Sequence, residues 1–588
     1  MKDFIKFTFA TLTGIVLAAV VFTILGIISV VGIMSSAETE TKVKENSVFM
    51  LELKGELLER SEDNPFKDLL MSEDIQSYGL DDILSSIKKA KENENIKGIY
   101  LNTEYLSASF ASLEEIRNAL LDFKKSKKFI VAYADQYSQG MYYLASVADK
   151  LIVNPQGTIS WHGLASQPIF FKDLLSKLGI EMQVFKVGTY KSAVEPFIST
   201  GMSEANREQV TALLESMWGK VLSDVSTSRK ISVDSLNSYA NQMMDLKQAD
   251  YYVKCNMADT LMYKDGVVTY LKKLTDRKED DRLRTLSLSE MTNVKKNTPK
   301  DKSGNIIAVY YAYGEIGQSV AADQSGINPA KVMADLRDLR DDDDVKAVVL
   351  RVNSPGGSAF GSEQIWHEVI RLKEKKPVIV SMGDYAASGG YYISCAADYI
   401  IADPTTLTGS IGIFGMIPNM EGLLTEKLGL KFDVVKTNKY SDMISINRPM
   451  NENEKAAMQN YINNGYKLFV KRCADGRKMS VEAIEKIAEG RVWTGIMAKE
   501  NGLVDELGGI EKAMAVAAQK AKIKDYTVIN YPAKENFLSN LFKNKKDNYI
   551  DARLQSSFGE YYNGVKFLQY LKDADRMQTR LPFELNIK

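Results

Sequence analysis

The chain has 588 residues, and 75 Lys and Arg against 76 Asp and Glu leave a formal net charge of −1 at pH 7. This balance gives no electrostatic reason to expect a nucleic-acid partner, because nucleic-acid-binding domains usually carry a strong positive charge. With only two histidines and three widely separated cysteines, the sequence argues against histidine-based triads, multi-histidine metal sites and disulfide frameworks. A hydrolase built on this sequence is therefore expected to use another base.

The first predicted element is an apolar segment near the N-terminus. Residues 7–34 contain no charged side chain, and these 28 residues exceed the roughly 20 that cross a bilayer as a helix. A cleaved signal has a shorter apolar region of about 7–15 residues, so a retained anchor is favoured, with cleavage at the small residues 35–37 as the alternative. Lys2 and Lys6 predict a cytoplasmic segment at 1–6, a single transmembrane anchor at 7–34, a linker at 35–45 and a large domain outside the cytoplasm.

The rest of the chain contains an internal duplication. Residues 96–101 (IKGIYL) resemble residues 345–350 (VKAVVL), and the same offset of 249 positions pairs Gly140 with Gly389 and Gly163 with Gly412. We therefore predict two related domains joined by a polar, lysine-rich linker. The first repeat spans 46–292, the linker 293–304, and the second repeat 305–535.

Within each copy, short β-branched runs alternate with amphipathic helical stretches. In the second copy, residues 347–352 are predicted as a buried strand, 362–375 as a helix and 377–382 as the next strand. This alternation predicts an α/β fold of stacked βαβ units around a parallel sheet. The C-terminal tail at 536–588 is charged and aromatic without clear strand signals, which leaves a helical appendage and an oligomer contact both open.

The two copies differ first in a glycine-rich turn. Residues 353–358 (NSPGGS) follow the strand of the second copy, whereas the counterpart at 104–109 (EYLSAS) has no glycine. Paired glycines let the backbone approach a ligand closely and can aim an N–H at an oxyanion. The alternative is a tight strand-to-helix turn without a role in chemistry.

The second difference places a serine at another strand-to-helix turn. Ser388, within residues 386–392 (AASGGYY), stands opposite Gln139 of the first copy. A serine followed by two glycines at such a turn can present its hydroxyl together with the next backbone N–H. A small-residue packing contact is the alternative, but the paired glycines in the same copy favour a nucleophile.

The third difference supplies a base. Residues 185–192 (FKVGTYKS) resemble residues 435–442 (VKTNKYSD), so Lys191 stands opposite Ser441, in the copy that lacks the candidate nucleophile. Buried beside Ser388, its amine would have a lowered pKa and could accept the serine proton, whereas the alternative is an ordinary surface lysine. Ser410, opposite Trp161, either orients that amine or simply occupies a turn.

The two histidines are weaker candidates. His162 stands opposite Ile411 and is the rival base, but its own copy has no serine–glycine turn. His367 lies inside a predicted helix and is expected to be a surface or packing residue.

Four motifs together carry a family resemblance. Over about residues 46–530, the chain resembles the signal peptide peptidase A family, also called protease IV, in its long bacterial form. The motifs are 188–197 (GTYKSAVEPF), 351–358 (RVNSPGGS), 386–394 (AASGGYYIS) and 407–415 (LTGSIGIFG). The resemblance implies a Clp-protease/crotonase-like fold in each copy. It also implies a membrane-anchored serine endopeptidase that assembles as a homotetramer on the outer, periplasmic face of the cytoplasmic (inner) membrane.

The resemblance also assigns roles to residues. It implies Ser388 as the nucleophile, Lys191 as the general base and Ser410 as the serine that orients the lysine. The backbone N–H groups of Gly389 and Gly357 are the expected oxyanion hole. The implied substrates are cleaved signal peptides and other unfolded apolar peptides, hydrolysed through an acyl-enzyme without a metal or cofactor.

Two other classes of function stay open at the level of sequence. The first is a catalytically inactive, membrane-associated scaffold of the same fold. The second is a crotonase-type enzyme that acts on acyl-coenzyme A, which the fold alone permits. That enzyme would need glutamates beside the oxyanion site and would have no use for Ser388 or Lys191.

Overall fold

The computed structural model describes residues 40–61, 77–295, 301–317, 326–534 and 577–580, with a few isolated positions between 6 and 21. The predicted cytoplasmic segment and anchor lie almost entirely outside these residues, as does most of the predicted tail. Within the described part of the chain, no helix is long and apolar enough to cross a membrane.

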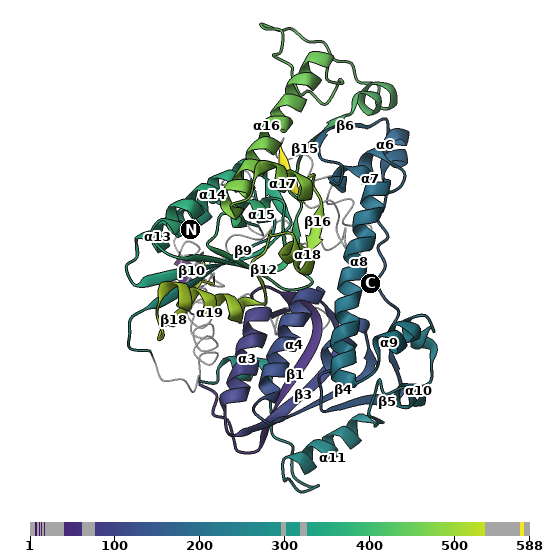
Figure 1. The fold of residues 1–588 in the computed structure, drawn as a ribbon, viewed down its shortest axis with the longest axis vertical. Helices are drawn as coiled ribbons and strands as arrows, with labels where there is room; N and C mark the ends of the chain where they lie inside the picture. The colour runs from purple at the N-terminus through teal and green to yellow at the C-terminus, as the bar shows by residue number, and fades with distance from the viewer. Residues whose placement is uncertain are drawn as a thin grey trace.

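Each repeat is built on its own sheet, the first in the lower half of Figure 1 and the second in the upper half. The strands of the first sheet are β1 (Ser47–Leu58), β2 (Ser77–Gly79), β3 (Ile96–Ser107), β4 (Phe129–Tyr137), β5 (Lys150–Ile159), β7 (Thr260–Leu261) and β8 (Thr285–Leu286). The strands of the second sheet are β9 (Ile306–Tyr313), β10 (Val345–Ser354), β12 (Val378–Ala387), β13 (Tyr399–Ala402), β14 (Leu407–Gly409), β16 (Val492–Thr494), β17 (Glu506–Leu507) and β18 (Thr527–Tyr531).

Helices cover both sheets. Those of the first repeat are α3 (Leu80–Glu92), α4 (Phe110–Lys124), α5 (Gln139–Ala145), α6 (Lys172–Leu178), α7 (Glu195–Ile198), α8 (Glu204–Arg229), α9 (Val233–Ala240), α10 (Ala249–Lys254), α11 (Lys264–Leu274) and α12 (Leu288–Thr292). Those of the second are α13 (Pro329–Asp341), α14 (Ala359–Lys373), α15 (Gly389–Ser394), α16 (Glu452–Arg477), α17 (Val481–Ile487), α18 (Gly495–Glu500) and α19 (Ile510–Ala521). Short helical turns of other pitch are η1 (Ser192–Val194), η2 (Met244–Leu246) and η3 (Gly422–Lys427).

The strand order is that of parallel βαβ units in both repeats. The first sheet runs β2-β1-β3-β4-β5-β7, with β8 also beside β1, and every pairing is parallel. The second runs β16-β14-β12-β10-β9-β18, with β13 between β12 and β17, and β16 is antiparallel to β14. The predicted α/β fold with a largely parallel sheet in each repeat is confirmed.

The elements predicted in the second copy are present, with shifted ends. The predicted strand at 347–352 lies inside β10, and the strand predicted at 377–382 is the first half of β12. Helix α14 begins three residues before its predicted start, because the Ser358 hydroxyl caps it by accepting the N–H of Gly361 at 3.0 Å. The longer β12 carries the chain directly to Ser388.

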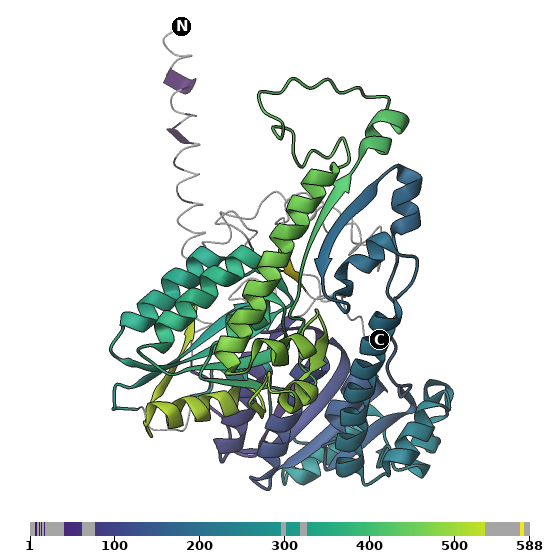
Figure 2. The ribbon, with the colours of Figure 1, turned by 45° about the horizontal axis from the view of Figure 1, so that its top comes forward.

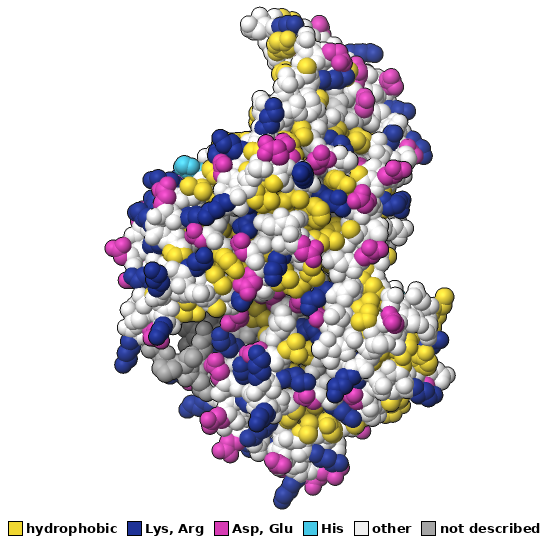
Figure 3. Space-filling model, in the orientation of Figure 1, with side chains coloured by type: hydrophobic (Ala, Val, Ile, Leu, Met, Phe, Trp, Pro, Cys, Tyr) yellow, Lys and Arg dark blue, Asp and Glu magenta, His cyan; other side chains and the backbone are white. Residues whose placement is uncertain are grey.

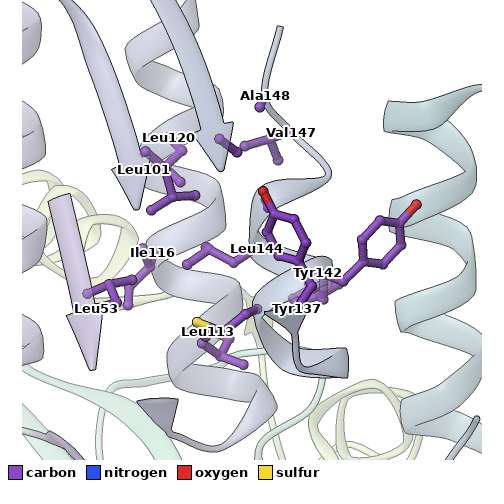
Figure 4. Close-up of a cluster of buried hydrophobic side chains, with 14 of the residues drawn as sticks. Leu53, Leu101, Leu113, Ile116, Leu120, Tyr137, Tyr142, Leu144, Val147 and Ala148 are labelled. Carbon is purple, nitrogen blue, oxygen red and sulfur yellow. The ribbon is translucent and has the colours of Figure 1, made fainter. Parts of the chain in front are cut away.

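The second sheet is packed on both faces. Successive side chains of a strand point to opposite faces, and in β10 Val348 and Leu350 join the core under α13 and α14, whereas Ala347 and Val349 join the core under α19. In the first repeat, Figure 4 shows the side chains of β1, β3, α4 and α5 meeting in one buried cluster. These cores hold rigid the strand ends from which the candidate site is built.

A smaller sheet joins the two repeats to the tail. Its order is β11 (Gly356–Ser358), β19 (Gln578–Arg580), β15 (Ile413–Asn419) and β6 (Glu181–Val187). Strand β6 of the first repeat is antiparallel to β15 of the second along its whole length, and the two lie side by side in Figure 2. This pairing carries the residues that follow β6 into the second repeat.

A buried ion cluster also fixes the two repeats against each other. Arg351 of β10 is 1% exposed and pairs with Glu59 at 2.6 Å and Glu115 at 2.5 Å, both from the first repeat. Asp384 accepts hydrogen bonds from the backbone N–H and the hydroxyl of Ser112. Because separating such groups would leave buried charges unpaired, at a cost of roughly 3–5 kcal/mol for each, the repeats keep one fixed orientation.

Candidate active site

Ser388 occupies the turn between β12 and α15. Its φ of 54° and ψ of −110° are unusual for a residue with a side chain, and such backbone strain costs about 1–3 kcal/mol. The turn is held because the Ser388 N–H donates to the carbonyl oxygen of Gly409 at 2.8 Å and its own carbonyl accepts from Tyr392 at 2.8 Å. The Ser388 side chain is fully buried, so its hydroxyl has one defined position.

The glycines after Ser388 permit close contact with the neighbouring turn. A Cβ on Gly389 would lie 2.7 Å from the Ser362 hydroxyl, and one on Gly390 would lie 2.7 Å from the carbonyl oxygen of Ser354. Gly356 and Gly357 have φ of 106° and 149°, which favour glycine, and a Cβ on Gly356 would lie 2.8 Å from the Gly389 nitrogen. The two glycine pairs of the sequence therefore meet in space.

Lys191 lies beside Ser388 although the two residues come from different repeats. Its Nζ is 2.9 Å from Ser388 Oγ, 2.9 Å from Ser410 Oγ and 3.1 Å from the carbonyl oxygen of Ser410. All three side chains are completely buried. Burial lowers the pKa of the Lys191 amine well below its usual range. The side chains of Lys191, Ser388 and Ser410, predicted from the sequence to act together, therefore meet within a single chain.

The loop that carries Lys191 is held by the second repeat. The Tyr190 N–H donates to the carbonyl oxygen of Glu489 at 3.0 Å. Gly490, with φ of 78°, approaches so closely that a Cβ on it would lie 2.6 Å from the Cβ of Lys191. Because a larger residue would displace the lysine, Gly490 is a positioning residue that the sequence motifs do not include.

Gln209 is a second positioning residue that sequence reasoning missed. Its Nε2 donates to the carbonyl oxygen of Tyr190 and to the hydroxyl of Ser192, both at 3.0 Å, and its Oε1 accepts from the N–H of Val492 at 3.3 Å. It is 1% exposed on α8, next to the core residue Val210. A polar side chain on the apolar face of a helix was the signal available in the sequence.

The counterpart of the serine turn in the first repeat has no nucleophile. Gln139 accepts from the N–H groups of His162 and Gly163 at 2.9 and 3.0 Å, and donates to the carbonyl oxygen of Gly163 at 2.9 Å. The side chain of His162 is exposed, as is His367 on α14. Ser441, opposite Lys191 in the alignment of the copies, is exposed as well.

The tail contributes to the site, which the sequence did not predict. The sequence shows no clear strand signals after residue 536, but Gln578–Arg580 form the strand β19, which lies between β11 and β15. The reason is its length, because three residues cannot show the two-residue periodicity that marks a strand.

Comparisons with known proteins decide the family. The model of Peptidase family S49 matches residues 122–278 and 370–524, one segment in each repeat. The chain belongs to peptidase family S49. This S49 chain is therefore a serine peptidase, and its predicted resemblance to the signal peptide peptidase A family is confirmed.

Several S49 relatives match most of the chain. "Protease 4" of Salmonella typhi is 41% identical over 78% of this chain and 75% of its own length. "Protease 4" of Haemophilus influenzae is 35% identical over 86% and 84%. The chloroplastic serine protease SPPA of Arabidopsis thaliana is 33% identical over 82% and 70%. A solved structure of a ClpP1 variant from Listeria monocytogenes aligns with 35% of this chain at 18% identity and a TM-score of 0.24.

Proposed function

We propose that this S49 peptidase is an endopeptidase with a catalytic dyad of Ser388 and Lys191. The observation that carries the proposal is the 2.9 Å between Lys191 Nζ and Ser388 Oγ in a fully buried setting. Burial favours the neutral amine, and a neutral amine at hydrogen-bond distance can accept the proton of the serine hydroxyl. The carbonyl oxygen and the hydroxyl of Ser410 each accept a hydrogen bond from the amine of Lys191. With both N–H groups held in this way, the lone pair of the neutral amine points at Ser388.

The reaction follows from this geometry. Lys191 takes the proton from Ser388 Oγ as Oγ bonds to the carbonyl carbon of the peptide. The N–H groups of Gly389 and Gly357 then donate to the oxyanion. Lys191 returns its proton to the leaving amine as the C–N bond breaks, which leaves an ester on Ser388. Lys191 then takes a proton from water as the water oxygen bonds to the ester carbon. Lys191 returns that proton to Ser388 Oγ as the ester C–O bond breaks, which releases the carboxylic acid and restores the dyad.

Gly357 is favoured over Gly356 as the second oxyanion donor. The N–H of Gly356 already donates to the Ser354 hydroxyl at 3.2 Å. Both glycines lie in the antiparallel ladder with β19, Gly356 opposite Arg580 and Gly357 opposite Thr579. The side-chain hydrogen bond made by the Gly356 N–H is therefore what supports Gly357 as the second donor.

The proposed location of the peptidase and its proposed substrates are argued from the amino-acid sequence. The uncharged segment 7–34 with lysines before it supports a single-pass anchor in the inner membrane, with the peptidase on its periplasmic face. An enzyme held at that surface meets apolar peptides that remain in the bilayer, which supports cleaved signal peptides as substrates. The largely parallel sheet of each repeat, with the serine turn at the carboxyl edge of the second, is consistent with the Clp-protease/crotonase-like fold.

A homotetramer is part of the proposal, and the duplication supports assembly through strand pairing. Strand β6 pairs with β15 inside one chain. Their counterparts are residues 431–437 of the second repeat and 164–170 of the first, and neither pairs with another strand among the described residues. We infer that 431–437 of one copy pairs with 164–170 of the next.

Labelling with a fluorophosphonate, which phosphonylates activated serines, tests the dyad. We expect wild-type protein to label at Ser388 and to hydrolyse an unfolded apolar peptide. Ser388→Ala and Lys191→Met should lose at least about a thousandfold in kcat/KM, because the dyad acts as a unit. Ser441→Ala, at the exposed position that aligns with Lys191, is the matched control and should keep full activity.

The same experiment separates the open alternatives. Hydrolysis that persists in Ser388→Ala would contradict the dyad. A wild-type protein that never labels and never cleaves would instead support the inactive scaffold.

A further inference from the structure

Arg491, the residue before β16, supports the Ser410 turn through its backbone. Its carbonyl oxygen accepts the N–H of Ser410 at 2.7 Å, and β16 then continues antiparallel to β14, with Val492 opposite Gly409. Ser410 has a φ of 51°, a conformation that a residue with a side chain keeps only when its surroundings hold it there. The backbone of Arg491 therefore fixes the turn whose two oxygens bind the amine of Lys191.

The side chain of Arg491 contacts the loop that carries Lys191. Its guanidinium carbon lies 4.6 Å from the ring centroid of Tyr190 and 4.6 Å from that of Trp493. The Nη1 group also donates to the Tyr190 hydroxyl at 3.2 Å. A cation over an aromatic ring is attracted by the negative face of the ring. Because Tyr190 precedes Lys191 directly, these contacts act on the residue next to the base.

Glu208 of α8 completes the contact, at a place where α8 lies beside β16 (Figure 1). Its carboxylate accepts from Arg491 Nη2 at 2.9 Å and from the Tyr190 hydroxyl at 3.2 Å. A planar guanidinium can stack on a ring while it donates to two acceptors, which the single ammonium of a lysine cannot do. The set of contacts is therefore specific for arginine at position 491.

We propose that Arg491 is a positioning residue that couples the Ser410 turn of the second repeat to the Lys191 loop of the first, and so keeps the amine buried beside Ser388. This inference rests on the proposed dyad. Arg491 acts through Ser410 and Tyr190, the two residues that it bonds on the way to the base. Its side chain is 23% exposed, so it lies at the rim of the site.

The pH dependence of catalysis distinguishes this role from a general contribution to folding. The charged side chains bonded to residues 189 and 190 are Arg491, Glu208 and Glu489. Burial by itself lowers the pKa of the Lys191 amine, so removing the charge of Arg491 should not change that pKa directly. A loosened loop would instead admit water, which stabilises the ammonium and raises the pKa toward its ordinary value. This direction is opposite to the one expected for Ser410→Ala.

Arg491→Met tests the proposal, because methionine keeps an unbranched apolar side chain and removes the ring contacts and both hydrogen bonds. We expect kcat/KM at pH 7 to fall about 10- to 100-fold, mostly through kcat, with the midpoint of the pH–rate profile raised by roughly one unit. Part of the rate should return at higher pH. Arg491→Lys keeps the charge but not the planar group, so it should behave like Arg491→Met.

Arg472→Met is the matched control. The Arg472 guanidinium carbon lies 3.8 Å from the Trp366 ring centroid, Nη2 is 2.5 Å from the Glu363 carboxylate, and the side chain is 24% exposed. Both variants should lose a similar amount of thermal stability, and only Arg491→Met should shift the midpoint. An unshifted midpoint in Arg491→Met, an equal shift in Arg472→Met, or full rescue by Arg491→Lys would overturn the proposal.

A double variant tests whether the coupling runs through Tyr190. Tyr190→Phe keeps the ring and removes the hydroxyl, so it should cause a smaller shift in the same direction. Added to Arg491→Met it should cost nothing further, because the contact is already lost, whereas additive losses would contradict coupling through Tyr190. Failure of the wild type and of Arg472→Met to label with the fluorophosphonate would contradict the dyad itself.

Discussion

At the scale of single residues, the burial of Lys191 is what suits it to the role of base in the proposed dyad. Loss of hydration alone lowers the pKa of the Lys191 amine, and the groups within hydrogen-bond distance of it are the hydroxyls of Ser388 and Ser410 and one carbonyl oxygen. A neighbouring carboxylate would have raised the pKa again by stabilising the ammonium. Burial thus favours the neutral amine that the proposed dyad requires.

This origin of the base predicts the pH dependence of catalysis. The neutral amine is the active form, so kcat/KM should rise with pH as Lys191 loses its proton, with a midpoint well below the ordinary lysine value of 10.5. Ser410→Ala removes an acceptor that stabilises the ammonium, so the midpoint should move to lower pH. Because the lone pair is then less well aimed, kcat should also fall, by about 10- to 100-fold with little change in KM.

A pH–rate profile of both proteins checks this prediction. A midpoint that does not move in Ser410→Ala would argue against its contact with the amine. A rate that falls as pH rises from 6 to 8 would argue against a neutral lysine as the base.

At the scale of secondary-structure elements, the site is made of turns that glycine allows to approach one another. The comparison of the two copies could predict Ser388, Lys191 and the pair Gly356 and Gly357, because each differs between otherwise similar segments. It could not predict Gly490, whose role arises from contact between the repeats. It could not predict Gln209 either, because that residue is marked by its place on the apolar face of α8 and not by a difference between the copies. Nor could it predict β19, a strand that exists only because two edges lie on either side of it.

Gly490→Ala tests the approach of the turn to the lysine loop. The added Cβ would lie 2.6 Å from the Lys191 Cβ, so we expect the loop to shift and kcat/KM to fall about 100-fold. Gly163→Ala is the matched control, because it has a similar φ of 82° but no atom within 4 Å of the new Cβ. Both variants should lose similar thermal stability, measured by calorimetry, and only Gly490→Ala should lose activity. Equal activity of the two would contradict the positioning role.

At the scale of the whole molecule, the same fold occurs twice, but the serine turn is found in the second copy and the lysine loop in the first. The counterpart of β6, residues 431–437, has no strand partner in the described residues and lies at the upper end of the molecule in Figure 1, where Figure 3 shows hydrophobic side chains among charged ones. Val435 there is 98% exposed and Phe432 is 46% exposed. An exposed apolar segment without a partner of its own favours pairing with another chain.

Val435→Asp tests the assembly proposed for this edge. Because the side chain is exposed in the single chain, the substitution should leave folding intact and weaken only the contact between copies. Light scattering after size-exclusion chromatography should show the wild type as a tetramer and the variant as smaller species. Phe360→Asp, which changes a 56% exposed aromatic on α14, should leave the mass unchanged. A variant with the wild-type mass would contradict pairing through this edge.

The distance along the chain between the two halves of the proposed dyad determines when activity can arise. Lys191 and Ser388 are 197 positions apart, and the pairing of β6 with β15 brings the lysine loop to the second repeat. If these two residues form the dyad, a chain that contains only the first repeat holds the proposed base and no nucleophile. A detached second repeat would hold the nucleophile and no base. Neither fragment should then hydrolyse peptides, so activity would arise only after both repeats have been made and joined.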